Sequence, residues 1–193
     1  MPAALSQERI EEIELETLIP ALRRRDDVVS LLKRGGIGLE LGVAEGSFSA
    51  RILKRDVLSY LYSIDMWAGD RGHDIEQYRI AIRQLEPYKE KNTLLRMRFD
   101  EALYLFPDNY FDFIYVDGYA HTGEEQGQTL RDWFPKLKVG GIFAGDDYSA
   151  AWPLVIIEVD KFVAENDLQL HVVQYQDEVD AFSQYPTWLV RKA

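Results

Sequence analysis

Acidic residues stand near the ends of four apolar segments that the sequence predicts to be strands. The segments cover residues 58–65, 93–99, 111–117 and 142–145, and the acids are Asp65, Asp100, Asp117, Asp146 and Asp147. In a doubly wound sheet the carboxyl ends of the strands meet at one edge, where ligands bind. Carboxylates gathered there repel one another unless a cation, hydroxyl groups or backbone donors meet them. The pattern therefore predicts a site for a cationic ligand that also carries a diol.

A glycine turn is predicted at the same edge. An apolar strand at residues 37–41 runs into Gly42 and Gly46, and a helix is expected from near Ser47. Glycine tolerates positive φ and a close approach to a ligand, and the start of a helix presents free N–H groups. Ala44 stands where a dinucleotide motif needs its middle glycine, and no P-loop lysine follows. The turn indicates a nucleoside-type ligand, with a purely structural strand-to-helix turn as the alternative.

Alternating strands and helices must position these residues, and the hydrophobic pattern predicts this alternation. Two further strands are expected at 168–175 and 187–191, and helices at 6–22, from Asp26, from near Ser47, from Asp74, after Thr122 and from Pro153. Val139-Gly140-Gly141 is expected to turn the chain into the strand at 142–145. The last two strands have too short a connection for a crossover helix, so an antiparallel pair is expected.

The predicted fold is therefore α/β. It is a doubly wound, seven-stranded, mostly parallel sheet with helices on both faces and an antiparallel last strand. We expect one domain, in which residues 1–35 form a helical segment that closes over the site as a lid and residues 36–193 bind the ligand.

Composition narrows the function classes. The chain of 193 residues has a formal charge of −11, which disfavours nucleic acid as a partner. The one basic cluster, Arg23-Arg24-Arg25, is followed by two aspartates and is interpreted as a solvated helix end. The absence of cysteine excludes disulfides and thiolate nucleophiles. No signal-like or membrane-spanning apolar run is present, so we expect a soluble, cytoplasmic protein with no membrane partner, and a homodimer by default.

Three segments carry a resemblance to a known family. Glu40 followed by Gly42-x-x-x-Gly46 resembles the first motif of class I S-adenosylmethionine-dependent methyltransferases. Residues 111–121 and 140–148 are similar to patterns of the small-molecule O-methyltransferase branch, which includes catechol O-methyltransferase-like enzymes and enzymes that modify antibiotics and sugars. The resemblance extends from about residue 36 to 192. It implies the Rossmann-like methyltransferase fold and S-adenosylmethionine as cofactor.

The resemblance also assigns cofactor-binding residues. It places Asp65 on the ribose hydroxyls, Asp100 at the adenine amine, Glu40 with the turn of Gly42 and Gly46 at the methionine end, and Asp117 near the methyl group. Trp67 either packs on the adenine face or is an ordinary rim aromatic.

The catalytic roles that the resemblance implies remain open. Some members bind Mg²⁺ through acids at the positions of Asp117, Asp146 and Asp147, and the alternative for the pair is a helix cap or an ion-paired loop. His121 is either the general base that deprotonates the acceptor or a loop histidine. It stands one residue later than in relatives, and Asp146 replaces a common histidine.

We therefore expect direct in-line methylation of a small-molecule hydroxyl, with Asp117 and His121 in the catalytic site. Tyr119, Tyr148 and Trp152 are candidates for an apolar wall around the acceptor, and His73 is expected at the surface, with a place in the acceptor pocket as the alternative. Competing hypotheses are aminopropyl transfer on the same fold and a non-catalytic nucleoside-binding domain.

Overall fold

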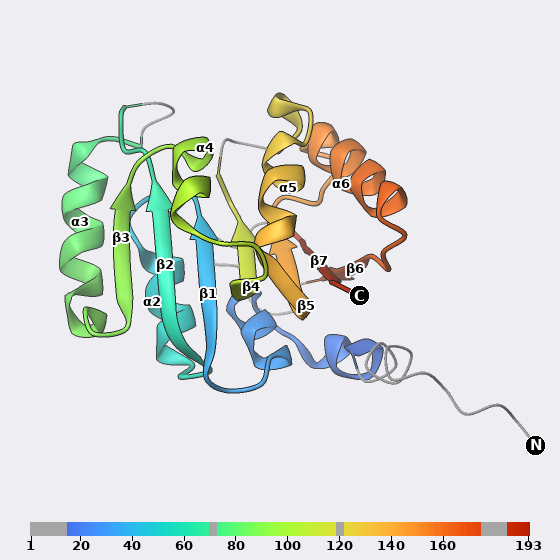
Figure 1. Cartoon of the computed structure of the whole chain (residues 1–193), viewed down its shortest axis with the longest axis horizontal. Helices are drawn as coiled ribbons and strands as arrows, with labels where there is room; N and C mark the ends of the chain where they lie inside the picture. Colours follow the sequence, from blue (N-terminus) through green and yellow to red (C-terminus); the bar gives the residue numbers. More distant parts are fainter. Residues whose placement is uncertain (1–14, 70–72, 119–121, 175–184) are drawn as a thin grey trace, which may run out of the picture.

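A seven-stranded sheet forms the centre of the molecule (Figure 1). The computed structural model describes residues 15–69, 73–118, 122–174 and 185–193. The strands are β1 (Gly36–Leu41), β2 (Leu58–Asp65), β3 (Asn92–Arg96), β4 (Phe111–Val116), β5 (Leu137–Gly145), β6 (His171–Val173) and β7 (Thr187–Arg191). Their order is β3-β2-β1-β4-β5-β7-β6. β1 to β5 run parallel, and β7 is antiparallel to both β5 and β6. The predicted fold class is confirmed.

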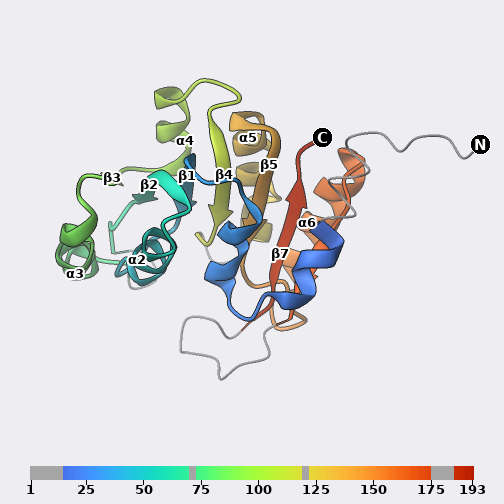
Figure 2. The same cartoon turned by 90° about the horizontal axis from the view of Figure 1, so that it is seen from below.

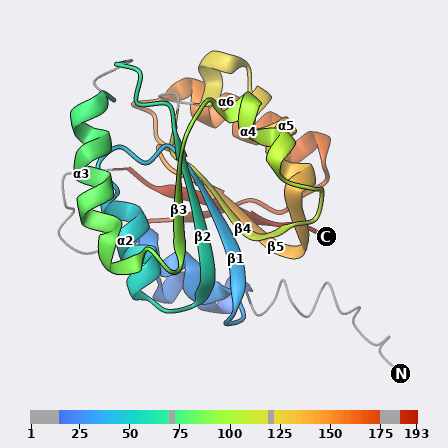
Figure 3. The same cartoon turned by 60° about the vertical axis from the view of Figure 1, so that its left-hand side comes forward.

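Helices cover both faces of this sheet. They are α2 (Ser47–Lys54), α3 (Ile75–Leu85), α4 (Phe99–Ala102), α5 (Gln128–Trp133) and α6 (Pro153–Glu165). Short 3₁₀ segments are η1 (Ile19–Ala21), η2 (Arg25–Leu31), η3 (Glu86–Tyr88), η4 (Leu103–Leu105), η5 (Thr122–Glu125) and η6 (Phe134–Lys136). Figure 3 shows α2 and α3 on one side of the sheet and α4, α5 and α6 on the other. Seen from below, the N-terminal segment lies on the α2 side (Figure 2).

The central strand β4 shows why the sheet needs cover on both faces. Phe113 and Tyr115 pack with the residues of α2 and η2, whereas Ile114 and Val116 pack with those of α5 and α6. All four side chains are buried. This confirms the sequence pattern of a central parallel strand, which is apolar on both faces.

Local sequence signals fix several helix starts. Asp74 caps α3, because its carboxylate accepts hydrogen bonds from the backbone N–H groups of Glu76 and Gln77. Pro153 begins α6 as predicted.

Several predicted boundaries were wrong, and β6, expected from residue 168, begins only at His171. β5 begins at Leu137, so Gly140 and Gly141 lie inside the strand rather than before it, and Gly140 has a φ of +78°. The helix expected after Thr122 is split, because α5 starts only at Gln128. β3 ends at Arg96, and Phe99 already belongs to α4. Within the described residues, no helix is long and apolar enough to cross a membrane.

Candidate active site

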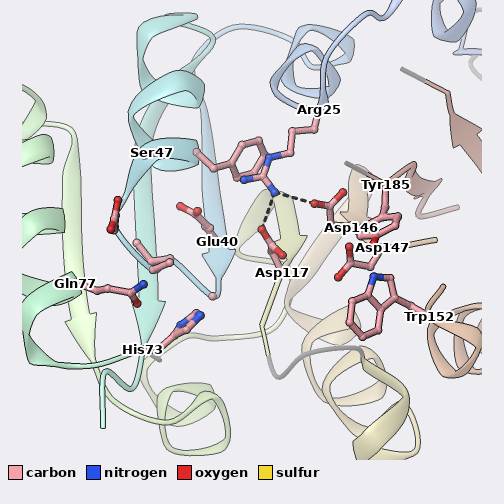
Figure 4. Close-up of a pocket in the computed structure, with 15 residues that line it drawn as sticks. Arg25, Glu40, Ser47, His73, Gln77, Asp117, Asp146, Asp147, Trp152 and Tyr185 are labelled. Carbon is pink, nitrogen blue, oxygen red and sulfur yellow. Dashed lines mark hydrogen bonds and ion pairs between the residues drawn. The ribbon is translucent and has the colours of Figure 1, made fainter. Parts of the chain in front are cut away.

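A cavity of about 350 Å³ opens at the carboxyl ends of β1, β4 and β5 (Figure 4). Its lining includes five of the residues that the sequence predicted for the site: Glu40, Gly42, Asp117, Asp146 and Asp147. Volumes of this order are typical of small-molecule sites, which range from roughly 300 to 1,000 Å³. The strand ends therefore gather the acids as expected, although four other predicted residues, Gly46, Asp65, Trp67 and Asp100, do not line this cavity.

The glycine turn is shaped by contacts within the protein. Gly42 has a φ of +96°, and a Cβ atom there would lie 2.0 Å from the carbonyl oxygen of Asp117. Gly46 has a φ of +81° and packs against Leu85 and Ala81 of α3. Gly42 thus allows the loop after β1 to pass directly under the loop after β4. The sequence had suggested that the glycines make room for a ligand, and the contact that requires Gly42 is with the backbone.

Asp65 is held by the same turn. Its Oδ2 accepts hydrogen bonds from the backbone N–H groups of Val43 (2.9 Å) and Ala44 (3.1 Å), and its Oδ1 accepts from that of Trp67 (3.0 Å). Nδ1 of His73 lies 2.9 Å from Oδ2. Burial alone would raise the pKa of Asp65, but the hydrogen bonds from His73 and the three backbone donors lower it. Asp65 is therefore ionised, and His73 lines the cavity in front of it.

Trp67 and Asp100 lie away from the cavity. Trp67 is only 1% exposed; its Nε1 donates to the carbonyl of Ala44 (2.8 Å), and its ring packs on Tyr78. It supports the glycine turn from below and is not a rim residue. Asp100 lies in α4, exposed, with two hydrogen bonds from the guanidinium of Arg98. Neither position, as described, offers a contact with a ligand in the cavity, so their adenine roles stay predictions.

Glu40 is a fully buried carboxyl group on the cavity wall. Its Oε2 accepts hydrogen bonds from the hydroxyls of Ser49 and Ser63. Its Oε1 has no hydrogen-bond partner among the described residues. Burial raises the pKa of Glu40 to about 8. A buried carboxyl oxygen without a donor fits a cationic ligand group, which would supply the missing hydrogen bond and favour ionisation.

Arg25 is a residue of the cavity lining that the sequence interpretation missed. It comes from η2, is 4% exposed, and lies over the ring of Phe48 at 4.2 Å. Its Nη1 donates to Oδ2 of Asp117 (2.7 Å) and to Oδ2 of Asp146 (2.8 Å). The prediction of a solvated helix end was therefore wrong for this residue, although the side chain of Arg24 is 53% exposed. No local pattern marks Arg25, because its partners lie 92 and 121 residues away.

The acids around Arg25 have raised pKa values. Burial and the neighbouring Asp117 raise the pKa of Asp146 to about 8 and that of Asp147 to about 7. Burial also raises the pKa of Asp117, against the opposing effect of Arg25. For Arg25, burial alone would lower the pKa, but Asp117, Tyr115 and Asp146 raise it well above its ordinary value. The guanidinium therefore stays charged and is the fixed cation of the site.

Two of the three predicted magnesium ligands, Asp117 and Asp146, are paired with Arg25. A divalent cation between Asp117 and Asp146 would have to share their oxygens with the guanidinium of Arg25, which carries the same sign of charge. The described part of the chain contains no group of three or more histidine, cysteine, aspartate or glutamate side chains arranged to hold a metal. The residues as placed do not fit Mg²⁺. His121 and Tyr119 lie outside the described residues, whereas Trp152 lines the cavity and Tyr148 bonds to Asp160.

The sequence of this domain was compared with known families. A family described as a methyltransferase domain matches residues 39–148, which is more than half of the chain. The chain belongs to this methyltransferase family. No curated protein matches the sequence significantly.

Solved structures agree with the fold of this methyltransferase. A Streptococcus mutans protein in complex with SAH matches with a TM-score of 0.64 and 15% identity, over 87% of this chain and 95% of that one. An SAM-dependent O-methyltransferase from Thermotoga maritima matches with a TM-score of 0.62 and 18% identity, over 86% of this chain and 63% of that one. An rRNA methylase from Streptococcus thermophilus matches with a TM-score of 0.59 and 12% identity, over 86% of this chain and 92% of that one. At these identities the likeness shows the shared fold.

S-adenosylmethionine is the cofactor that the resemblance implies for this methyltransferase, and the cavity suits it. The unpartnered Oε1 of Glu40 fits an α-ammonium group, and the turn of Gly42, Val43 and Ala44 forms the neighbouring wall. Asp65 is the acid that the resemblance places on the ribose, and His73 lies beside the oxygen that a ribose hydroxyl would need.

Proposed function

We propose that this methyltransferase transfers a methyl group to a hydroxyl oxygen of a small molecule. The observation that carries the proposal is the cavity of about 350 Å³ in which Arg25 pairs with Asp117 and Asp146, with Glu40 and Asp147 in the same lining. One end of this cavity suits the methionine part of the cofactor, and the other holds charged groups that can bind and deprotonate a polar acceptor.

The residues of the chain fall into two groups along the cavity. Glu40 and the glycine turn hold the methionine end, and Asp65 takes the ribose once its hydrogen bond with His73 is released. Asp117, Asp146 and Asp147 then lie on the acceptor side, together with the aromatic ring of Trp152. Holding both reactants in one cavity is itself a large part of catalysis, because orientation replaces a bimolecular encounter.

The chemistry follows from this placement. S-adenosylmethionine supplies an activated methyl group, whose bond to sulfur breaks, with the electron pair left on sulfur, as the bond to the acceptor oxygen forms. The proton of the acceptor hydroxyl must pass to a base. Asp147 lines the cavity, and its pKa of about 7 is suited to accept a proton near neutral pH. His121 is the second candidate for this role.

Small hydroxyl compounds are favoured over RNA by charge. The formal charge of −11 and the acids around the cavity repel a phosphate backbone. The similarity to an rRNA methylase extends to the fold, and the similarity to an O-methyltransferase is of the same kind.

A methyl-transfer assay with labelled S-adenosylmethionine tests the proposal. Panels of phenols, sugars and hydroxy acids are compared with ribosomal RNA, and we expect label only in the small hydroxyl compounds. For an active acceptor, kcat/KM should rise with pH through about 7 and fall by roughly 100-fold in Asp147→Asn. The exposed Asp167→Asn serves as the matched control and should retain full activity. Label in RNA alone, or in none of the hydroxyl compounds, would refute O-methylation of small molecules.

A further inference from the structure

The cation at the acceptor end comes from outside the residues that match the family. The family match begins at residue 39, whereas Arg25 belongs to η2 in the N-terminal segment. η2 packs against α2, where Val28 and Val29 share a core with Phe48 and Ile52. Buried apolar contacts therefore fix the backbone from which the guanidinium reaches the strand ends.

The position of the guanidinium is rigidly determined. The ring of Phe48 supports one face of Arg25, and the two carboxylates hold Nη1. Nε is buried and has no hydrogen-bond acceptor among the described residues. Figure 4 shows the group pointing into the cavity between Glu40 and the two aspartates. Both ion pairs use Nη1, so the edge that carries Nη2 is the part of the guanidinium available to a ligand.

This geometry bridges the two strands that a metal ion would bridge. Asp117 follows β4 and Asp146 follows β5, and Arg25 links them with one positive charge. A guanidinium donates hydrogen bonds in a fixed plane and does not dissociate, so it can orient an oxygen and stabilise negative charge without metal binding.

We propose that Arg25 takes the place of a divalent metal ion in the acceptor site, so that methyl transfer by this protein is metal-independent. The inference rests on the proposed function. The guanidinium donates a hydrogen bond to the acceptor oxygen and stabilises the negative charge that forms as the hydroxyl proton moves to the base. The oxygen then attacks the methyl carbon, the carbon–sulfur bond breaks and S-adenosylhomocysteine leaves. Asp117 and Asp146 hold Arg25 in place and are positioning residues in this scheme.

Activity measurements provide the first test. Wild-type activity should be unchanged by EDTA and by added Mg²⁺. Arg25→Gln should lower kcat at least ~100-fold, the usual effect of removing a donor to a developing oxyanion. Arg25→Lys should lower kcat by a smaller factor, because lysine keeps the positive charge but lacks the planar guanidinium. Arg24→Gln, one residue away and exposed, is the matched control and should behave as wild type. Loss of wild-type activity on chelation, restored by Mg²⁺, would overturn the inference, and so would a folded Arg25→Gln variant within about threefold of wild type.

Metal binding gives a readout that does not depend on activity. Titration calorimetry with Mn²⁺ should show no binding to the wild type. Arg25→Ala leaves three acids without their cation and should gain a Mn²⁺ site, which Asp146→Asn in the same variant should remove. Mn²⁺ binding by the wild type that Asp146→Asn abolishes, or no binding by folded Arg25→Ala, would contradict the inference. If Arg25→Ala does not melt cooperatively, the Mn²⁺ titration of the wild type and the chelation assay still decide whether the protein uses a metal ion.

The two proposals fail in different ways. If the wild type binds S-adenosylhomocysteine but methylates no hydroxyl compound, the proposed function is wrong, and the Mn²⁺ titrations still test Arg25. If hydroxyl compounds are methylated and the reaction needs a metal, only the inference on Arg25 is wrong.

Discussion

Glu40→Gln should change how the stability of the protein depends on pH. The carboxyl group is fully buried, and burial raises its pKa from the ordinary 4.5 to about 8. In the unfolded chain Glu40 ionises near its ordinary pKa. Between these two values the folded state therefore binds one more proton than the unfolded state. The stability that this group contributes is complete below pH 4.5 and is lost as the pH rises to about 8.

The size of the effect follows from the same two values. One proton of difference corresponds to about 1.4 kcal/mol of unfolding free energy for each pH unit. From pH 5 to pH 8 the wild type should thus lose up to ~4 kcal/mol through Glu40. Asp146 and Asp147 add to the loss, since their pKa values are raised as well. Glutamine has the same shape and cannot ionise, so Glu40→Gln should remove only the part that belongs to Glu40.

Urea denaturation at pH 5, 6, 7 and 8 measures this difference. We expect the free energies of Glu40→Gln and wild type to diverge with rising pH, the variant becoming the more stable by several kcal/mol at pH 8. Glu165→Gln, at the exposed end of α6, is the control and should run parallel to wild type. Parallel curves for Glu40→Gln would show that Glu40 is ionised in the folded protein and would refute the electrostatic description of the site.

Three further variants test the turn and its neighbours. Gly42→Ala should lower the unfolding free energy, measured in urea, by at least ~3 kcal/mol, because the new Cβ would overlap the Asp117 backbone. Gly69 has a similar φ but open space around it, so Gly69→Ala is the control and should lower the unfolding free energy by only ~1 kcal/mol. Equal losses of stability in the two variants would exclude the clash. Trp67→Phe should lower the unfolding free energy by ~2 kcal/mol, because the hydrogen bond from Nε1 to the carbonyl of Ala44 is lost. Its affinity for S-adenosylhomocysteine, measured by calorimetry, should change less than about threefold. A tenfold loss of affinity would favour a contact between Trp67 and the adenine. His73→Ala should bind that ligand at least as tightly as wild type, because His73 occupies Oδ2 of Asp65, the proposed ribose acid. Weaker binding would give His73 a direct ligand role.

The fold could be predicted because its determinants are local. Apolar runs define the strands, and β2 and β7 have the predicted limits. Asp74 and Pro153 set helix starts through their own chemistry. The acids near the strand ends follow from the same strands, so Asp117, Asp146 and Asp147 could be placed at the sheet edge before any coordinates were known.

The position of Asp100 was missed for a local reason. The side chain of Glu101 accepts a hydrogen bond from the backbone N–H of Arg98, which starts α4 directly after β3. The helix turns Asp100 outward, where Arg98 binds it. The strand pattern that continued to Phe99 hid this competing capping signal.

The burial of Arg25 and Trp67 could not be predicted, because distant residues set the surroundings of both side chains. Arg25 is buried only once η2 docks on α2 and its side chain meets Asp117 and Asp146. Trp67 has a φ of +41°, a conformation that no local pattern announces for a bulky residue, and it turns under the glycine loop. A cluster of charged residues can be seen in the sequence, but the ion-pair partner of each charge is known only once the chain is folded.

Calorimetric titration of S-adenosylhomocysteine into wild type, Asp65→Asn and Asp100→Asn tests the central claim that the cavity at the carboxyl ends of β1, β4 and β5 holds the cofactor. We expect saturable one-to-one binding by the wild type and a loss of at least ~100-fold in affinity for Asp65→Asn, whose carboxylate holds the turn of Val43 and Ala44 that lines the cavity. Asp100→Asn should bind as wild type, because the Asp100 side chain is exposed on α4 and pairs with Arg98. Unchanged affinity in Asp65→Asn, or no binding by the wild type, would contradict the claim.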